Sequence, residues 1–134
     1  MLDNIDLMEY WLKSAENDYE AMQVMFNNKK NTWTLFLGHL VIEKLLKGLY
    51  AKSHQENPYT IKSHNLLALA EKCDLELTDE QVQKLQIITQ FNISSRYDDY
   101  KESFYQKCTD EYTIEQVKNI EEVRVWLKSL LITE

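Results

Sequence analysis

Glycine and proline are scarce in this chain: its 134 residues include two glycines and one proline. A β-sandwich or a β-barrel needs such residues at its many tight turns, so their scarcity argues against an all-β architecture. An all-helical chain needs few of them. At this length the chain can form one domain with one core, and it is too short for two ordinary domains.

Cysteine is also rare, and the two present, Cys73 and Cys108, are too few and too separated for a disulfide scaffold or a zinc site. We expect reduced thiols, as in a cytoplasmic protein. His39 and Glu43 lie one helical turn apart, but no third ligand is placed by the sequence. Two glycines cannot build a phosphate-binding or dinucleotide-binding loop. We therefore expect no metal and no cofactor.

Long apolar runs are missing as well. The longest, residues 35–42, is interrupted by Gly38 and His39. Three acidic residues precede the first basic residue, which is the opposite of the start of a signal peptide. We expect neither an export signal nor a membrane span.

Acidic residues outnumber basic ones by 22 to 15, giving a net charge of −7, so the molecule as a whole repels nucleic-acid backbones. Residues 29–62 are different, because they contain six lysines and only two glutamates. This stretch predicts either a basic face for an anionic ligand or acidic partner, or an ordinary solvated lysine-rich helix surface.

Apolar residues recur at three- and four-residue steps through most of the chain, which predicts long helices at 4–26, 33–53 and 79–93 and a short one at 64–73. A fourth long helix, capped by Thr113, is expected to end near residue 132. Asp3 or Asn4, Asn31 or Thr32, Ser63, and Thr78 are the other expected caps. The predicted fold is all-α, an antiparallel up-and-down four-helix bundle with a short additional helix, forming a single domain over 1–134. We expect Trp11, Trp33 and Trp126 in its core.

Four short segments, in order along the chain, resemble the HEPN family of helical domains. They are AENDY at 15–19, EKLLKGL at 43–49, SHNLLAL at 63–69 and SRYD at 95–98. The resemblance implies a five-helix bundle that often dimerises, with arginines from both protomers lining a shared cleft. It also implies either a metal-independent ribonuclease or a protein encoded beside a small nucleotidyltransferase, which in some members modifies a tyrosine with AMP.

Catalytic members of the family place a histidine four to six residues after the arginine of the last segment, here Arg96. In this chain Lys101, Glu102 and Ser103 occupy that window, and all three histidines lie upstream. RNA cleavage through the 2′-hydroxyl needs a group that exchanges a proton near neutral pH, for which histidine is best suited. His64 is expected to belong to a structural turn. The ribonuclease prediction is thereby weakened.

Candidate site residues cluster in two places. Arg96 is the candidate catalytic residue, with an intramolecular ion pair as the alternative. Glu43 and Lys47, four residues apart, are expected to form a surface ion pair, while Lys44 is free to reach a partner or an adenylate phosphate. The predicted nucleotide- or partner-binding set is Glu43, Lys44, Lys47, Tyr97 and Asp98.

Tyrosines follow Arg96 at positions 97, 100, 105 and 112. They are candidates for base stacking, for a subunit interface, or for modification, with Tyr100 and Tyr105 the expected acceptors. The sequence therefore predicts a homodimeric partner subunit of a nucleotidyltransferase in a toxin–antitoxin or defence pair. The alternatives are an RNA endonuclease that uses Arg96 and an adenylate-binding sensor.

Overall fold

Six α-helices make up the protein in the computed structural model, which describes residues 3–59, 63–96 and 98–133, without the side chains of 93–99. The helices are α1 (Asn4–Asn27), α2 (Asn31–Ser53), α3 (Leu66–Lys72), α4 (Asp79–Arg96), α5 (Asp98–Lys107) and α6 (Asp110–Ile132). The described residues contain no strand, so the predicted all-α class is confirmed. None of the described helices is long and apolar enough to cross a membrane.

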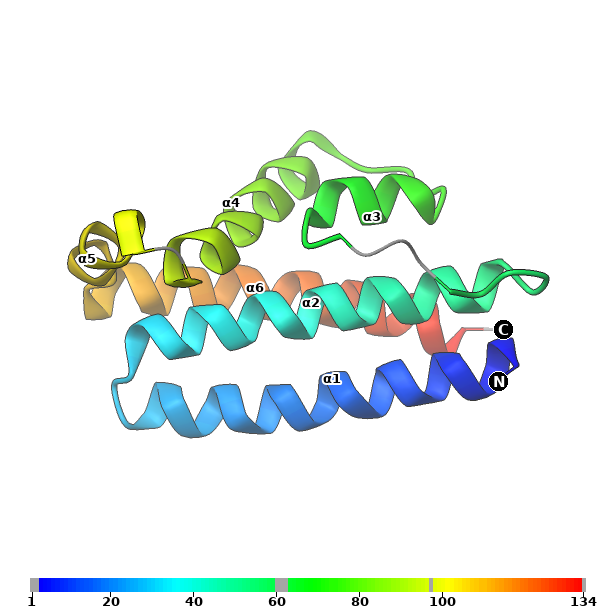
Figure 1. Ribbon diagram of the computed structural model, residues 1–134, viewed down its shortest axis with the longest axis horizontal. Coiled ribbons are helices and arrows are strands. Elements are labelled where there is room, and N and C mark those ends of the chain that lie inside the picture. Colours follow the sequence, from blue (N-terminus) through cyan, green and yellow to red (C-terminus); the bar gives the residue numbers. More distant parts are fainter. Residues whose placement is uncertain (1–2, 60–62, 97, 134) are drawn as a thin grey trace.

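The four long helices alternate in direction along the chain, as predicted for an up-and-down bundle. In Figure 1, α1 and the inclined α4 run one way, whereas α2 and α6 run the other. Helix α2 is central and packs against each of the other five helices. Helices α1 and α6 flank α2, while α3 and α4 cover another of its faces. This arrangement explains why about half of α2 is buried, including Leu35, Ile42 and Leu46.

Both glycines lie in α2, where neighbouring helices approach closely. A Cβ added at Gly48 would meet a Leu131 methyl at 3.3 Å and Trp11 Cβ at 3.4 Å. One added at Gly38 would lie 2.4 Å from Cδ1 of Ile120. The expected close approach of another helix at Gly48 is confirmed. The approach is closer still at Gly38, where the neighbouring Ile120 leaves less room for a side chain.

Helix caps are partly as predicted. Asp3 accepts from the Asp6 amide at 2.8 Å, and Thr78 forms the expected reciprocal capping box at the start of α4. Ser63 is not the cap of α3, because the chain enters the helix two residues later and Asn65 accepts from the Ala68 amide. Thr113 is also not a cap. Helix α6 begins a turn earlier, after Thr109, which leaves Thr113 buried in the helix.

Helix α2 begins at Asn31 without a side-chain cap, which differs from the expected cap at Asn31 or Thr32. The Asn31 side chain instead donates to the Cys108 carbonyl and to Asp110, both at 2.9 Å. The turn between α1 and α2 is thereby tied to the junction between α5 and α6.

Helix α5 was not predicted. It is mostly polar and places one large apolar side chain in the core: Phe104, which is 6% exposed and packs against Phe91 of α4. A single buried apolar residue does not produce the three- and four-residue apolar spacing from which a helix is predicted. Beside α5 lies Trp33, which is 59% exposed. The expectation that Trp33 is a core residue is therefore wrong. Trp33 lies in the first turn of α2, where it lines an open groove between α2 and α5.

Candidate functional site

A buried carboxylate, Glu43, lies at the centre of a polar cluster on α2. Glu43 is 4% exposed, and its Oε1 accepts from Nδ1 of His64 at 2.7 Å. Its Oε2 accepts from Nζ of Lys47 at 3.2 Å. The predicted Glu43–Lys47 pair therefore exists, but it is not a surface pair. A buried carboxylate needs such partners, since an uncompensated charge would be strongly destabilising.

His39 completes the cluster one turn before Glu43. Its ring is fully buried, and Nε2 donates to the His64 carbonyl at 3.1 Å. This bond places the proton on Nε2, so Nδ1 is a bare acceptor, and it has no hydrogen-bond partner among the described residues. Burial lowers the pKa of His39 to about 4, against the opposing attraction of Glu43 and with smaller contributions from His64 and Lys47. His39 is therefore neutral at physiological pH.

His64 differs from His39 because its side chain is 55% exposed while its Nδ1 is held by Glu43. A neutral imidazole that donates Nδ1–H to a carboxylate keeps its Nε2 lone pair for a proton, as in base–carboxylate pairs of hydrolases. The same segment lies against α4, since the Leu66 amide donates to Oγ1 of Thr89 at 3.1 Å. An imidazole held by a buried carboxylate thus lies beside the helix that ends at Arg96.

Lys44 does not project freely toward solvent. Its Nζ lies 2.6 Å from Oδ2 of Asp18 on α1, and both side chains are about one-fifth exposed. Lys47, further along the same helix, lies over the Trp11 ring at 5.1 Å. An anionic ligand that used Lys44 would have to displace Asp18.

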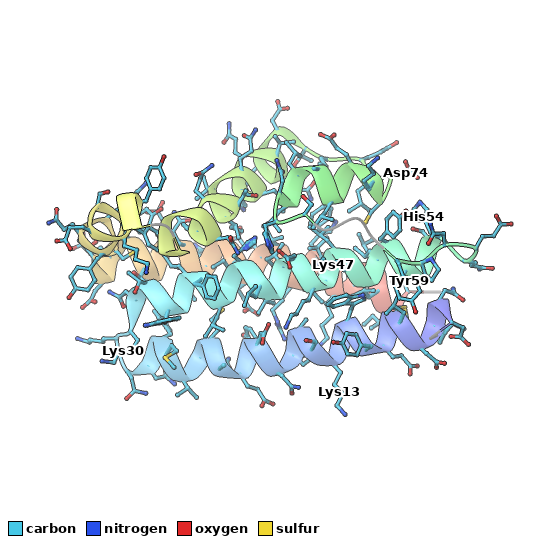
Figure 2. The ribbon with its side chains drawn as sticks, in the orientation of Figure 1. Lys13, Lys30, Lys47, His54, Tyr59 and Asp74 are labelled. Carbon is cyan, nitrogen blue, oxygen red and sulfur yellow. The ribbon has the colours of Figure 1, made fainter. Side chains whose placement is uncertain are left out.

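The described lysines of residues 29–62, Lys29 to Lys52, do not form one basic face; Lys62 lies outside the described residues. Figure 2 shows Lys30 at the turn after α1 and Lys47 well along α2. Lys29 pairs with Asp110 at 3.6 Å. Lys52 donates to the carbonyls of Leu130 and Leu131, so it ties the end of α2 to the end of α6. Partners from other parts of the chain thus compensate much of this local excess of positive charge.

Three predicted site residues fall where the structure describes little. The backbone of Arg96 closes α4 and that of Asp98 opens α5, but their side chains and all of Tyr97 are outside the described residues. Arg96 comes seven residues after Thr89, two helical turns further along α4. Its expected catalytic role stays a prediction.

The two tyrosines singled out for modification lie on α5 and are accessible. Tyr100 is 53% exposed and Tyr105 is 70% exposed. Tyr105 lines an open groove of about 590 Å³ between the start of α2 and the middle of α5. The other lining residues are Thr32, Trp33, Phe36, Lys101, Glu102 and Phe104.

The aromatic part of this groove was missed from the sequence. Trp33 and Phe36 are spaced i, i+3 and stand edge to face, with centroids 6.2 Å apart. Their spacing also fits a core-facing stripe, so only the position of Trp33 in the first turn of its helix, next to a polar loop, could have signalled exposure.

No group of three or more His, Cys, Asp or Glu side chains suited to a metal ion occurs among the residues that the structure describes.

Comparisons with known proteins agree with this architecture. A family model described as "HEPN domain" matches residues 8–130. Among solved structures, the chain is similar to TT1696 from Thermus thermophilus, with a TM-score of 0.75 and 18% identity over 92% of this chain and 98% of that one. At that identity the likeness shows the fold alone. No curated protein matches the sequence.

Proposed function

Because this chain belongs to the HEPN family, we propose that it is the partner subunit of a nucleotidyltransferase in a toxin–antitoxin or defence pair. In this proposal it is a cytoplasmic homodimer, and its own ribonuclease activity is weak or lost. The family match supports the assignment to HEPN domains. The exposed surface described next supports the binding of a protein partner.

The observation that carries the proposal is the display of tyrosines on α5. Tyr105 and Tyr100 expose more than half of their surface, and the aromatic groove lies directly beside Tyr105. Exposed aromatic side chains around a concave apolar surface are typical of protein interfaces. A partner that docks on Trp33 would therefore hold its active site close to the Tyr105 hydroxyl.

The corresponding chemistry is transfer of a nucleotide to a phenol. The tyrosine Oη bonds to the α-phosphorus of a nucleoside triphosphate, the bond to the β-phosphate oxygen breaks, and pyrophosphate leaves. The phenolic proton passes to a base of the nucleotidyltransferase. This chain contributes the acceptor and the docking surface, which requires no catalytic histidine of its own.

Docking can be tested by co-expression with the product of the adjacent gene, which the proposal expects to be a nucleotidyltransferase. Trp33→Glu places a charge in the groove and should abolish co-purification of the pair. The matched control is Tyr10→Glu on α1, which changes an aromatic side chain of similar exposure, 52%, outside the groove. Equal recovery of the partner with both variants would contradict docking at this site.

A second candidate, metal-independent RNA cleavage, is favoured by one observation, the His64–Glu43 pair. In this reaction Nε2 of His64 accepts the proton of a ribose 2′-hydroxyl while that oxygen bonds to the adjacent phosphorus. The bond from phosphorus to the 5′-oxygen breaks, and the leaving oxygen takes a proton from solvent. Arg96 would serve as the guanidinium that stabilises charge on the phosphate.

This candidate predicts cleaved RNA in the presence of a chelator, lost in both His64→Gln and Arg96→Ala. His54→Gln is the matched control, because His54 stacks on Tyr50 and lies outside the Glu43 cluster. Intact RNA at high concentrations of the wild-type protein eliminates the candidate and leaves the partner-subunit proposal untouched.

A further inference from the structure

A second groove lies between α1 and α6, and none of its described lining residues belongs to the groove beside Tyr105. We propose that it binds a basic amphipathic helix of another protein, that is, a helix with an apolar face flanked by lysine or arginine. The inference goes beyond the proposed function, because it concerns a different face of the bundle and requires no nucleotidyltransferase.

The groove is large, and its lining is apolar where a helix would rest. It has a volume of about 940 Å³, and its apolar lining includes Met22 and Phe26 of α1 and Val117 of α6. Ile114 and Val125 of α6 also line it and are 57% and 55% exposed. It exists because α1 and α6 both pack on α2 rather than against each other. A groove between two helices of this kind accepts the apolar face of a third helix, with side chains spaced i, i+3, i+4 and i+7.

Polar contacts at one end hold the two walls of the groove together. The Tyr19 hydroxyl donates to Oε2 of Glu121 at 2.7 Å, and Arg124 donates to Oε1 of Glu121 at 2.9 Å. Glu16 of α1 pairs with Lys128 at 2.7 Å and with Arg124 at 3.6 Å. The walls are therefore positioned within the monomer, which lowers the cost of binding. The charges at this end are also compensated within the chain.

The solvent-exposed edges of the groove are acidic beyond this end. On α6, four exposed residues at spacings of 4, 3 and 4 share one face of the helix, and two of them, Lys118 and Glu122, line the groove. The four are Glu111, Glu115, Lys118 and Glu122. On α1, Gln23 and Asn27 line the groove, and the exposed Glu20 lies one turn before Gln23 on the same face. Each edge therefore presents glutamate to an incoming helix.

Most of these carboxylates have no compensating cation. Within the described part of the chain, Glu20, Glu111 and Glu115 form no ion pair, whereas Glu122 pairs with Lys84 of α4. Lys118 is the one cation on the α6 edge, and its charge lies close enough to Glu122 to help lower the pKa of that carboxyl. Lysine or arginine on the flanks of a bound helix would therefore meet free carboxylates. Such exposed pairs set the choice of partner, while the apolar lining supplies most of the affinity.

The same charges argue against other occupants of the groove. The chain carries a net charge of −7, so the phosphates of a nucleic acid are repelled from an acidic edge. A second copy that docked through α6 would bring its own glutamate-rich edge against this one. A basic amphipathic helix satisfies both the apolar lining and the acidic edges.

The first test uses two stapled helical peptides that share one leucine face and carry either lysine or glutamate on both flanks. Calorimetry should show saturable binding of the lysine peptide, with the glutamate peptide weaker by about tenfold or more. In methyl NMR spectra, the lysine peptide should shift the signals of Met22 and Val117. Val125→Asn should weaken binding of the lysine peptide. Ile132→Asn is the matched control on the same helix, because Ile132 is 67% exposed and does not line the groove.

The second test reverses the charge of the edges. Glu20→Lys combined with Glu115→Lys should weaken the lysine peptide and strengthen the glutamate peptide. Glu71→Lys combined with Glu76→Lys is the matched control, because it changes the net charge by the same amount at two exposed positions outside the groove. The control should leave the preference between the two peptides unchanged, since distant exposed charges are screened by salt.

Three results would overturn the inference. The first is no binding of the lysine peptide, or equal binding of the two peptides. The second is binding that Val125→Asn leaves unchanged or that shifts methyl signals away from the groove. The third is a control charge variant that alters the preference as much as the edge variant, which would assign the preference to net charge. None of these results bears on the modification of Tyr105 or on docking at Trp33, so the proposed function is tested separately.

Discussion

Acidification should destabilise this protein through one residue, His39. Its ring is fully buried, and burial lowers its pKa in the folded state to about 4. In the unfolded chain a histidine has a pKa of about 6.5. Below that value the unfolded chain binds a proton that the folded protein does not accept, so the free energy of unfolding falls as the pH falls from about 6.5 to about 4.

The size of the effect follows from the two pKa values. At about 1.4 kcal/mol per pKa unit, the complete loss amounts to about 3 kcal/mol, and about 2 kcal/mol of it is expected by pH 5. This is a large fraction of the stability of a typical small domain, which is about 5–15 kcal/mol. The neighbouring groups Glu43, His64 and Lys47 are included in the folded-state pKa of His39, with Glu43 opposing the effect.

The assay is urea unfolding at pH 7.5, 6 and 5, followed by far-UV circular dichroism, for the wild type and His39→Gln. The variant removes the titrating ring and retains a donor that can reach the His64 carbonyl. Carboxylates titrate in both proteins and cancel in the difference, so the wild type should lose about 2 kcal/mol more than the variant between pH 7.5 and pH 5. Parallel losses in the two proteins would refute the reasoning, as would an NMR titration that shows the His39 ring protonating near pH 6.5.

Two further predictions concern packing and caps, each with a paired control in the chain. Gly38→Ala should lower the free energy of unfolding by about 1–2 kcal/mol more than Gly48→Ala, because its new methyl meets the buried Ile120 side chain far more closely; urea midpoints that rank the two the other way would contradict this. Thr78→Ala should cost about 1 kcal/mol by removing the capping box of α4, whereas Thr113→Val should be neutral or stabilising because the Thr113 hydroxyl is buried without a partner among the described residues. A measured loss for Thr113→Val as large as that for Thr78→Ala would show that the second hydroxyl is bonded.

The bundle was predictable because long amphipathic helices follow from local patterns. The three- and four-residue spacing of apolar side chains located α1, α2, α4 and most of α6, and Thr78 with Gln81 marked the start of α4. The short α3 was also expected. Helix α5 was not, because its stability comes from one buried phenylalanine, Phe104, and from the helices beside it.

The polar cluster could not be predicted in the same way. The sequence places Glu43 and Lys47 one turn apart, which is equally typical of an exposed pair. Burial of Glu43 depends on the segment that contains His64, 21 residues further along, crossing over α2. The pairing of Lys44 with Asp18 likewise joins two helices, so neither contact has a local signal.

The central claim is that α5 presents an acceptor tyrosine to a nucleotidyltransferase partner, and intact-mass spectrometry of the co-expressed pair tests it most directly. The account predicts that this chain gains the mass of a nucleotidyl group on Tyr105 or Tyr100, and that the gain disappears when both are replaced by phenylalanine. An unmodified chain after incubation with an active partner and nucleoside triphosphate, or a modification that persists in the double phenylalanine variant, would contradict it.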